Sequence, residues 1–340
     1  MDFASGQILA ENNADQRLPP ASITKLMTAY LVDKAIVDGD ISLDELVTVS
    51  EKAWRMKGSL MFIEVGEKVS VRNLLKGLII HSGNDASVAL AEHIAGSEAA
   101  FVGYMNHQAQ LLGMNNTNFV NATGWPHPDH YSTARDLAVL TRAMIAEFPE
   151  SYRHYRERTF TYNNISQPNR NKLLRRDESV DGVKTGHTEE AGYCLVASAK
   201  RGEMRLISVL LGSRTELARF DSSLALLNYG FRFYETHRLY EARQMIKAER
   251  VWYGNQKEVA IGVPGDIHVT IPRGRYSDLD ASMEIDNQIE APVTSGQQLG
   301  QINVRLDDVL LVSEPIVAIQ GVGEASLLTR MLDRIKLMFR

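Results

Sequence analysis

The most informative part of this 340-residue sequence is Pro20-Ala21-Ser22-Ile23-Thr24-Lys25-Leu26-Met27-Thr28, in which a serine precedes a lysine by three positions at the start of a helical pattern. Side chains at this spacing lie on one face of a helix, with Cβ atoms about 5–6 Å apart. A serine hydroxyl becomes a good nucleophile only when a base takes its proton, and a lysine with a lowered pKa can be that base. We therefore interpret Ser22 as a nucleophile and Lys25 as its activating base.

A second motif, Ser82-Gly83-Asn84, separates two helical patterns, so its side chains are expected to point out of a tight connection into a cleft. The hydroxyl of Ser82 can relay a proton between Lys25 and a leaving amine. The side chain of Asn84 has both a donor and an acceptor with which to hold a substrate amide.

A third motif, Lys184-Thr185-Gly186, lies late in a β-rich run. We expect Lys184 to be the second cation that lowers the pKa of Lys25. Thr185 can bond a carboxylate, and Gly186 lets a substrate backbone lie close against an edge strand. The next residue, His187, supplies a backbone N–H that can stabilise an oxyanion.

The backbone N–H of Ser22 is expected to be the other oxyanion donor, because it lies at the positive end of a helix. Taken singly, each motif has an ordinary structural explanation: a helix N-cap for Ser22, a turn for the second motif and a strand end for the third. Each pattern occurs once, and all three occur together. Their conjunction favours one catalytic site.

Composition narrows the class of protein. The hydrophobic fraction of 44% and charged fraction of 23% are ordinary for a globular protein, and the formal net charge of −5 gives no support for a nucleic-acid partner. The single cysteine, Cys194, excludes an internal disulfide. No apolar run is long enough to span a membrane, and no leader peptide opens the chain. Either the protein is cytoplasmic or a signal peptide has been removed.

The pattern along the chain predicts three parts: a catalytic domain over 1–237, a small all-β domain over 238–325 and a terminal helix over 326–340. Within the first part we expect a hairpin over 1–18, with Phe3 and Ile8-Leu9 in its strands, and helices over 70–80, 84–95, 98–112, 133–147 and 214–234. The last of these presents Leu217, Phe220, Leu224, Leu227 and Phe231 on one face. Three β-runs lie within 181–213.

The terminal segment 326–340 is amphipathic and basic. Its apolar face carries Leu328, Met331, Leu332, Ile335, Met338 and Phe339, and its charged residues are Arg330, Asp333, Arg334, Lys336 and Arg340. This pattern is typical of a helix that lies in a membrane surface and is attracted to anionic lipid. The alternative is a terminal helix docked on the β domain.

Two other groups favour structural interpretations. His127 and His130 lie in a proline-containing segment without a third ligand, so a surface loop is favoured over a metal site. Cys194 lies within an apolar β-run and is expected to be a buried thiol.

Together the motifs resemble those of the low-molecular-mass penicillin-binding proteins, specifically the D-alanyl-D-alanine carboxypeptidases of the penicillin-binding protein 5 and 6 group. The resemblance covers essentially the whole chain. It extends beyond the three motifs to Ser82–Ala86, Tyr131–Asp136, Val180–Thr188, Gly192-Tyr193, Ile271–Arg275 and Ile335–Phe339.

The resemblance implies an α+β fold: a β-lactamase/transpeptidase-like catalytic domain, with an antiparallel sheet flanked by helices, followed by a small all-β sandwich. It implies that Arg219 holds a substrate's terminal carboxylate with Thr185, and that Arg170 lies near the cleft. The loop after Trp54 is shorter than the family leads us to expect. A periplasmic location, peripheral to the inner membrane of a bacterium, is implied as well.

The implied activity is a serine D-Ala-D-Ala carboxypeptidase that acts on the pentapeptide stems of peptidoglycan through a Ser22 acyl-enzyme and is acylated by β-lactams. No metal or organic cofactor is required. One alternative is a serine β-lactamase, but the E-x-x-L-N pattern of class A enzymes does not occur between Ser82 and Lys184. The other is a cell-wall binding or scaffolding protein with an idle active site.

Overall fold

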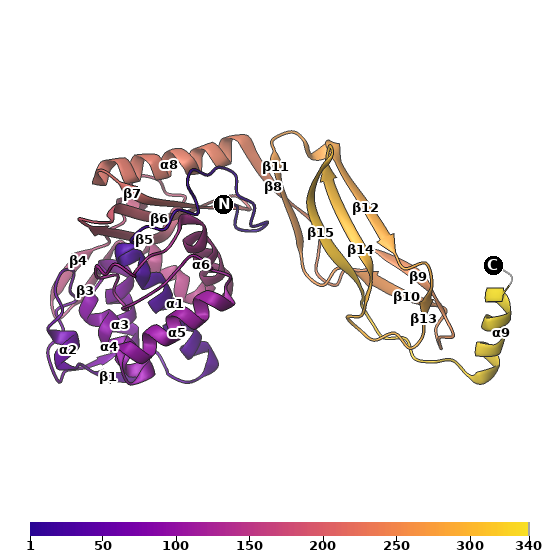
Figure 1. Cartoon of the computed structure of the whole chain (residues 1–340), viewed down its shortest axis with the longest axis horizontal. Coiled ribbons are helices and arrows are strands. Elements are labelled where there is room, and N and C mark those ends of the chain that lie inside the picture. Colours follow the sequence, from indigo (N-terminus) through magenta and orange to yellow (C-terminus); the bar gives the residue numbers. More distant parts are fainter. Residues whose placement is uncertain (339–340) are drawn as a thin grey trace. The chain divides into compact units, whose positions relative to one another are not determined.

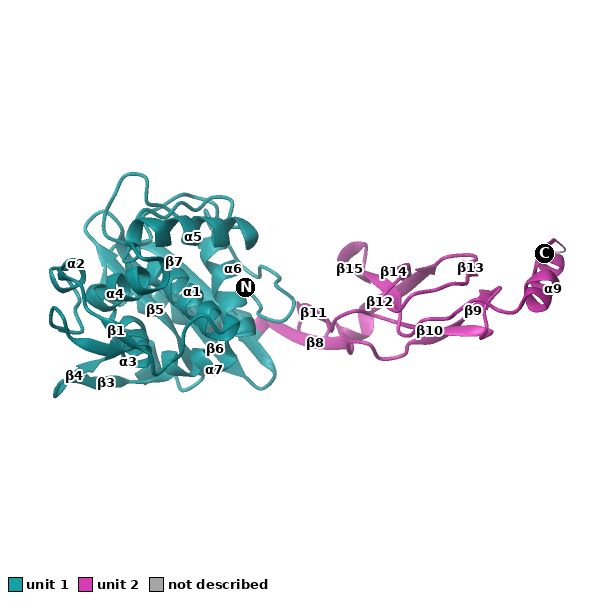
Figure 2. Cartoon of the chain, turned by 90° about the horizontal axis from the view of Figure 1, so that it is seen from below, with its two compact units in different colours: residues 1–232 teal, residues 233–340 magenta. Residues whose placement is uncertain are grey.

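The computed structural model describes residues 1–338, and the chain divides into two compact units (Figures 1 and 2). The first unit is Met1–Arg232, and the second begins at Phe233. The sequence places this boundary later, between residues 237 and 238. The difference arises because strand β8 (Tyr234–Tyr240) follows helix α8 (Glu216–Phe233) directly, with no turn residue to mark the change, and pairs with β11 of the second unit.

The first unit is built on an antiparallel sheet of three strands, in the order β5-β6-β7. These strands are β5 (Val180–Thr188), β6 (Gly192–Arg201) and β7 (Met204–Ser213). Figure 1 shows α8 along one face of the sheet and the other helices gathered on the opposite face. Residues Cys194–Ala199 of β6 are all buried, which is expected of a strand covered on both faces.

The buried face of α8 differs from the predicted one. Leu217 is 65% exposed. The buried residues are Arg219, Phe220, Ser223, Leu227, Gly230 and Phe231. Residues two positions apart on a helix point in nearly opposite directions. Because Arg219 turns toward the sheet, Leu217 turns away from it.

The predicted helices are confirmed, with one division. The helical elements are η1 (Ala21–Thr24), α1 (Lys25–Asp38), α2 (Glu51–Trp54), α3 (Val71–Lys76), η2 (Gly77–His81), α4 (Asn84–Ala95), α5 (Glu98–Leu111), α6 (Ala134–Glu147), α7 (Pro149–Tyr152), η3 (Arg153–Arg156) and η4 (Lys172–Arg175). The helix expected over 70–80 becomes α3 followed by the single π-helical turn η2. Two small sheets complete the unit: β1 (Leu46–Thr48) with β2 (Lys68–Ser70), and β3 (Thr159–Tyr162) with β4 (Ile165–Pro168).

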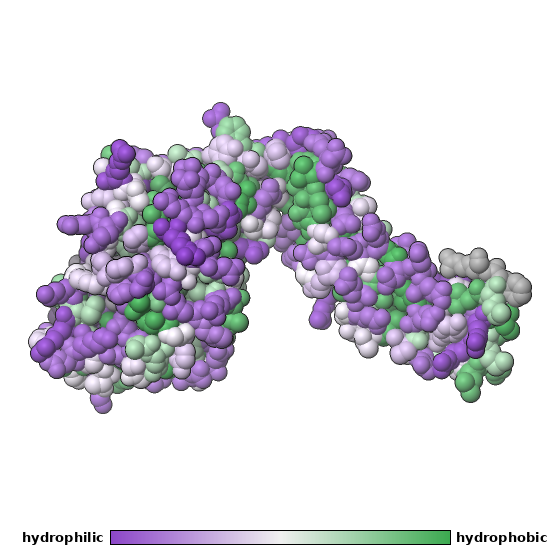
Figure 3. All heavy atoms as spheres, viewed as in Figure 1, coloured by the Kyte–Doolittle hydropathy of each residue, from purple (hydrophilic) through white to green (hydrophobic). Residues whose placement is uncertain are grey.

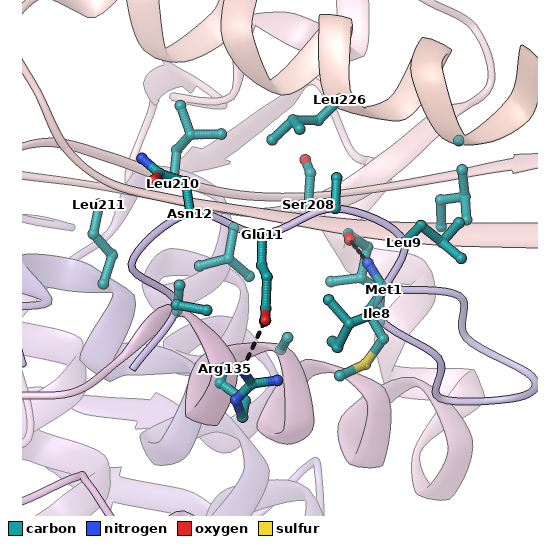
Figure 4. Close-up of a pocket in the computed structure, with 18 of the residues that line it drawn as sticks. Met1, Ile8, Leu9, Glu11, Asn12, Arg135, Ser208, Leu210, Leu211 and Leu226 are labelled. Atoms are coloured by element: carbon teal, nitrogen blue, oxygen red, sulfur yellow. Dashed lines mark hydrogen bonds and ion pairs between the residues drawn. The ribbon is translucent and has the colours of Figure 1, made fainter. Parts of the chain in front are cut away.

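The predicted N-terminal hairpin is wrong. Its turn exists, since the N–H of Gly6 donates to the carbonyl of Asp2, and residues 1–3 pair with the outer edge of β7. The expected second strand at Ile8-Leu9 does not form. A cavity of about 450 Å³ lies between residues 8–14 and β7, so this segment has no strand to pair with (Figure 4). None of the three motifs lines this cavity.

Up to its terminal helix, the second unit is built mainly of β-strands, as predicted. A six-stranded sheet has the order β12-β14-β15-β10-β9-β13, and a two-stranded sheet pairs β11 with β8. The strands not yet given are β9 (Lys247–Trp252), β10 (Glu258–Gly262), β11 (Ile267–Pro272), β12 (Leu279–Ile285), β13 (Ile289–Glu290), β14 (Gln298–Leu306) and β15 (Val309–Ala318), with the short helical turn η5 (Tyr276–Asp278) between β11 and β12. Along β14 the alternate residues Ile302, Val304 and Leu306 are buried, as expected of a strand with one face covered.

The unit ends in helix α9 (Leu327–Met338), as predicted from residue 326 onward. Phe339 and Arg340, which belong to the predicted pattern, lie outside the described residues. Among residues 1–338, no helix is both long enough and apolar enough to cross a bilayer.

Candidate active site

Ser22 and Lys25 face each other at the start of the first long helix. Ser22 lies in the turn η1, and α1 begins at Lys25. The Nζ of Lys25 donates to Ser22 Oγ at 3.1 Å, to Asn84 Oδ1 at 2.7 Å and to the carbonyl oxygen of Thr123 at 2.7 Å. Three acceptors therefore fix the amine beside the hydroxyl from which it must take a proton.

Burial makes Lys25 a suitable base. Its side chain has no exposed surface, and this burial lowers its pKa from 10.5 to about 7, against an opposing effect of the Asp85 carboxylate. A lysine with this pKa is substantially neutral near pH 7. The sequence predicts burial and the charge of Lys184 as the causes of this lowering, and in the structure burial is the cause.

Of the two lysines, Lys184 is the one whose pKa is lowered by burial and also by the charge of the other lysine. This residue is also buried, and burial followed by the charges of Lys25, Arg170 and Arg219 lowers its pKa well below the ordinary value. Its Nζ donates to Ser82 Oγ at 2.8 Å and to the carbonyl of Thr185 at 3.0 Å. The third motif therefore contacts the second motif through the hydrogen bond between Lys184 and Ser82.

Ser82 occupies the left-handed region, with φ of 70°, directly after the π-helical turn η2. This conformation reverses the chain and brings its buried hydroxyl to Lys184. Ser82 is therefore placed to exchange a proton with Lys184. Its proposed relay to Lys25 remains a prediction.

Both polar groups of the Asn84 side chain have partners within the protein. Its Oδ1 accepts from Lys25, and its Nδ2 donates to the carbonyl of Lys57 at 2.6 Å. Its backbone N–H donates to the carbonyl of Ser59 at 2.7 Å. In this state Asn84 orients the base and holds the loop after Trp54, so a substrate amide must share or replace these bonds.

The short loop after Trp54 is anchored by Asp85, which the sequence analysis does not single out. Its buried carboxylate accepts the N–H groups of Met61, Phe62 and Ala86 at 2.8–2.9 Å. Its position directly after the second motif is the signal that could have found it. A carboxylate with several backbone donors holds its loop firmly.

Gly186 is required for a reason other than the predicted one. A Cβ atom at this position would lie 2.9 Å from the carbonyl oxygen of Pro20 and 3.2 Å from the nitrogen of Ser22. The absent side chain therefore lets the nucleophile's own turn lie against β5. It also brings the backbone of Ser22 beside the strand that carries His187, where the two predicted oxyanion donors belong.

The remaining predicted residues lie around β5. Thr185 is buried, and His187 is exposed, with its ring 4.0 Å from that of Tyr193. Arg219 is 5% exposed and donates to the carbonyl of Gly186 at 3.1 Å, so its guanidinium supports the strand beside Ser22 from within. In this state it is not open to solvent, and its contact with a substrate carboxylate remains a prediction.

Arg170 is exposed and lies beside the second motif. Its Nη2 is 3.2 Å from Ser59 Oγ and 3.2 Å from His81 Nε2. The sequence analysis overlooks His81, although it directly precedes Ser82. Burial, followed by the charge of Arg170, lowers the pKa of His81 to about 4. The imidazole is therefore neutral near pH 7.

Thr123 is also missed by the sequence analysis, although its carbonyl binds Lys25. The turn that presents this carbonyl is held by Asn121, whose Oδ1 accepts the N–H groups of Thr123, Gly124 and Trp125 at 2.8–3.2 Å. An asparagine followed by a glycine three positions later is a turn signal that marks this segment.

The sequence favours structural roles for Cys194, His127 and His130, and His130 differs from its prediction. Cys194 is fully buried, which confirms its prediction as an interior thiol. His127 is exposed, but His130 is 3% exposed and bonds Thr24 through Nε2 at 2.8 Å, so it is not the surface residue expected. Within residues 1–338, no cluster of three or more histidine, cysteine, aspartate or glutamate side chains is arranged to hold a metal ion.

Two family models together match most of the chain. The family model for D-alanyl-D-alanine carboxypeptidase matches residues 1–215, and the model for the penicillin-binding protein 5 C-terminal domain matches residues 234–324. The chain is 45% identical to the D-alanyl-D-alanine carboxypeptidase DacC of Escherichia coli, over 100% of this chain and 87% of the relative.

Solved structures agree as well. Penicillin-binding protein 5 from Haemophilus influenzae is 44% identical, with a TM-score of 0.91 over 95% of this chain and 96% of that one. Penicillin-binding protein D2 from Listeria monocytogenes, in an ampicillin-bound form, is 35% identical, with a TM-score of 0.62 over 68% of this chain and 94% of that one. The chain belongs to the D-alanyl-D-alanine carboxypeptidase family.

Proposed function

We propose that the chain removes the terminal D-Ala from peptidoglycan pentapeptide stems through an acyl-enzyme on Ser22. The observation that carries this proposal is the contact of a fully buried, partly neutral lysine with the serine hydroxyl. Lys25 takes the proton as Ser22 Oγ attacks the penultimate D-Ala carbonyl carbon. The developing oxyanion is stabilised by the backbone N–H groups of Ser22 and His187.

Breakdown of the tetrahedral intermediate expels D-Ala as an amine, which needs a proton. The Lys184–Ser82 hydrogen bond places a donor at the side of the cleft where β5 lies. The proton that Lys25 took from Ser22 passes through Ser82 to this amine, so Lys25 is neutral again. Water then attacks the acyl-enzyme, Lys25 takes the proton of the water, and it returns that proton to Ser22 Oγ as the product leaves. Every proton transfer in this sequence uses a side chain of the site.

A β-lactam is expected to acylate the same serine, because its strained amide and its carboxylate occupy places like those of the stem peptide. The ampicillin-bound penicillin-binding protein D2 supports this extension by similarity. In a β-lactam the leaving amine stays tethered to the acyl group, so it remains beside Ser22 and blocks the attack of water. We therefore expect the adduct to persist.

The test measures D-Ala released from a diacyl-Lys-D-Ala-D-Ala peptide, with Ser22→Ala as the control. We expect release by the wild-type chain and none by the variant. A folded wild-type chain that releases no D-Ala would contradict the proposal and favour the idle scaffold. Rapid loss of labelled penicillin from Ser22, within seconds, would favour the β-lactamase.

We further propose that the protein works in the bacterial periplasm, attached to the surface of the inner membrane by α9. Six apolar side chains of this helix are 52–79% exposed: Leu327, Leu328, Met331, Leu332, Ile335 and Met338. The green surface over α9 in Figure 3 is made by these residues. The helix meets its own unit through a polar contact instead, in which Asp333 accepts the N–H of Tyr253 at 3.1 Å. This arrangement supports membrane attachment over docking on the β unit.

Binding to vesicles tests the attachment. The full chain is expected to sediment with vesicles rich in phosphatidylglycerol, and the triple substitution Leu328→Ser, Leu332→Ser and Ile335→Ser is expected to reduce the bound fraction at least tenfold. The matched control is Val309→Ser with Leu310→Ser, which removes exposed apolar side chains of the same unit from a strand. Equal binding by all three proteins would reject the attachment.

A further inference from the structure

His81 lies between the second motif and an exposed arginine. It ends the π-helical turn η2, is 9% exposed, and directly precedes Ser82. Its Nε2 lies 3.2 Å from Nη2 of Arg170. A guanidinium is always a donor, so Nε2 accepts this hydrogen bond and the imidazole is neutral. Its neutral state agrees with its burial.

The backbone on either side of Arg170 is held rigidly. Asn169 is buried and donates from Nδ2 to the carbonyl of Glu157 at 2.9 Å, and Asn171 is buried and donates to the carbonyl of Gly182 at 2.8 Å. The root of the Arg170 side chain is therefore fixed. The rest of the Arg170 side chain can rotate, and the contacts of its guanidinium with His81 and Ser59 hold it in one position.

The charge of Arg170 acts on both sides of the cleft. It lowers the pKa of His81 beside the second motif and the pKa of Lys184 in the third. The other arginine of this region, Arg219, is buried and donates to the carbonyl of Gly186. Arg170 is exposed, so its guanidinium can meet an anion from solvent without breaking a bond to the backbone.

We propose that His81 is a positioning residue that holds Arg170 ready for the terminal carboxylate of the substrate. The inference rests on the proposed carboxypeptidase function and adds to it. An unheld arginine side chain loses rotamer entropy when it binds. A neutral acceptor that orders the guanidinium in advance removes part of this cost, and its effect is felt only by a ligand that carries a carboxylate.

The test compares acylation of Ser22 by benzylpenicillin and by its methyl ester, which differ in the carboxylate. In His81→Leu, the second-order rate constant for the acid is expected to fall about tenfold, while that for the ester changes less than twofold. The ester therefore reports whether the variant is folded and its nucleophile intact. With the peptide substrate, the same variant is expected to raise KM and leave kcat nearly unchanged.

Two further variants distinguish positioning from a general structural role. His81→Gln keeps an acceptor oxygen for the guanidinium and is expected to stay within threefold of the wild type with the acid. Arg170→Ala is expected to lose at least as much as His81→Leu, and the double variant is expected to lose no more than Arg170→Ala, because His81 acts through Arg170.

Equal losses with the acid and the ester, or additive losses in the double variant, would overturn the inference and leave the carboxypeptidase function intact. A folded wild-type chain that reacts with neither compound would overturn both. The two failures are therefore distinguishable.

Discussion

Gly124→Ala is expected to reduce acylation of Ser22 by penicillin at least a hundredfold. Gly124 has φ of +81°, and a Cβ atom there would lie 1.8 Å from the carbonyl oxygen of Ala21 and 2.9 Å from Thr24 Oγ1. The first contact is with backbone, so no rotamer change relieves it. Either the turn that carries Ser22 or the turn that presents the Thr123 carbonyl to Lys25 must move, and displacement of about 1 Å can cost 10²-fold in rate.

Gly113→Ala is the matched control. Gly113 has a similar φ of +75°, but no atom lies within 4 Å of the position its Cβ would take. Both variants carry the strain of a left-handed alanine, about 1–2 kcal/mol. Only Gly124→Ala is expected to lose acylation, measured by mass spectrometry and normalised to the folded fraction from thermal unfolding. Equal acylation rates in the two variants would show that the contact with Ala21 is unimportant.

Lys25→Met is expected to reduce acylation by about 10²–10⁴-fold, the usual range for a lost general base. The pH profile of the wild type tests the same idea without a mutation. Because burial lowers the pKa of Lys25 to about 7, its neutral fraction falls tenfold for each pH unit below that value. Acylation by penicillin is therefore expected to be nearly level above pH 8 and about a hundredfold slower at pH 5.

The stability of the folded chain is expected to rise with pH as well. The folded pKa of Lys25 is below that of the unfolded chain, so folding releases a proton between about pH 7 and 10, and stability rises with pH across that window. Below pH 7 the full cost of burying the ammonium is present. Lys25→Met removes this cost, which exceeds the cost of leaving the acceptors of Lys25 unpaired, so the unfolding free energy at pH 6 is expected to rise by about 1–3 kcal/mol.

The exposed residue Lys34 provides the control on the same helix. It pairs with Asp38 at the surface, with 45% of its side chain accessible. Lys34→Met is expected to leave both the rate and the pH profile of acylation unchanged. A Lys25→Met variant that keeps its activity, or a wild-type profile without an inflection near pH 7, would remove Lys25 as the base.

The sequence was sufficient to predict which side chains of the three motifs lie together, and most helices. Ser22 and Lys25 are three positions apart on one helical face, so their contact is local and follows from helix geometry. The approach of Lys184 to Ser82 was predicted from shared chemistry, since 102 positions separate them. The N-terminal hairpin failed because a turn signal does not ensure a partner for each strand.

The roles of the two glycines and the two arginines near the site could not be predicted from the sequence. Nothing local to Gly124 or Gly186 shows that each lies against the Ser22 turn. Arg219 was predicted to bind a carboxylate, but whether an arginine is exposed or buried is decided by the elements packed around it. The same is true of Arg170 and His81, which are 89 positions apart and meet only in the folded chain.

The sequence by itself determined the family and the contact between Ser22 and Lys25, because these rest on residue types at short, regular spacings. Only the tertiary structure decided how the base is tuned. Burial is a property of three-dimensional packing, and it is burial that lowers the pKa of Lys25. The same packing places the Thr123 carbonyl and Asn84 around that amine, since each comes from a distant segment of the chain.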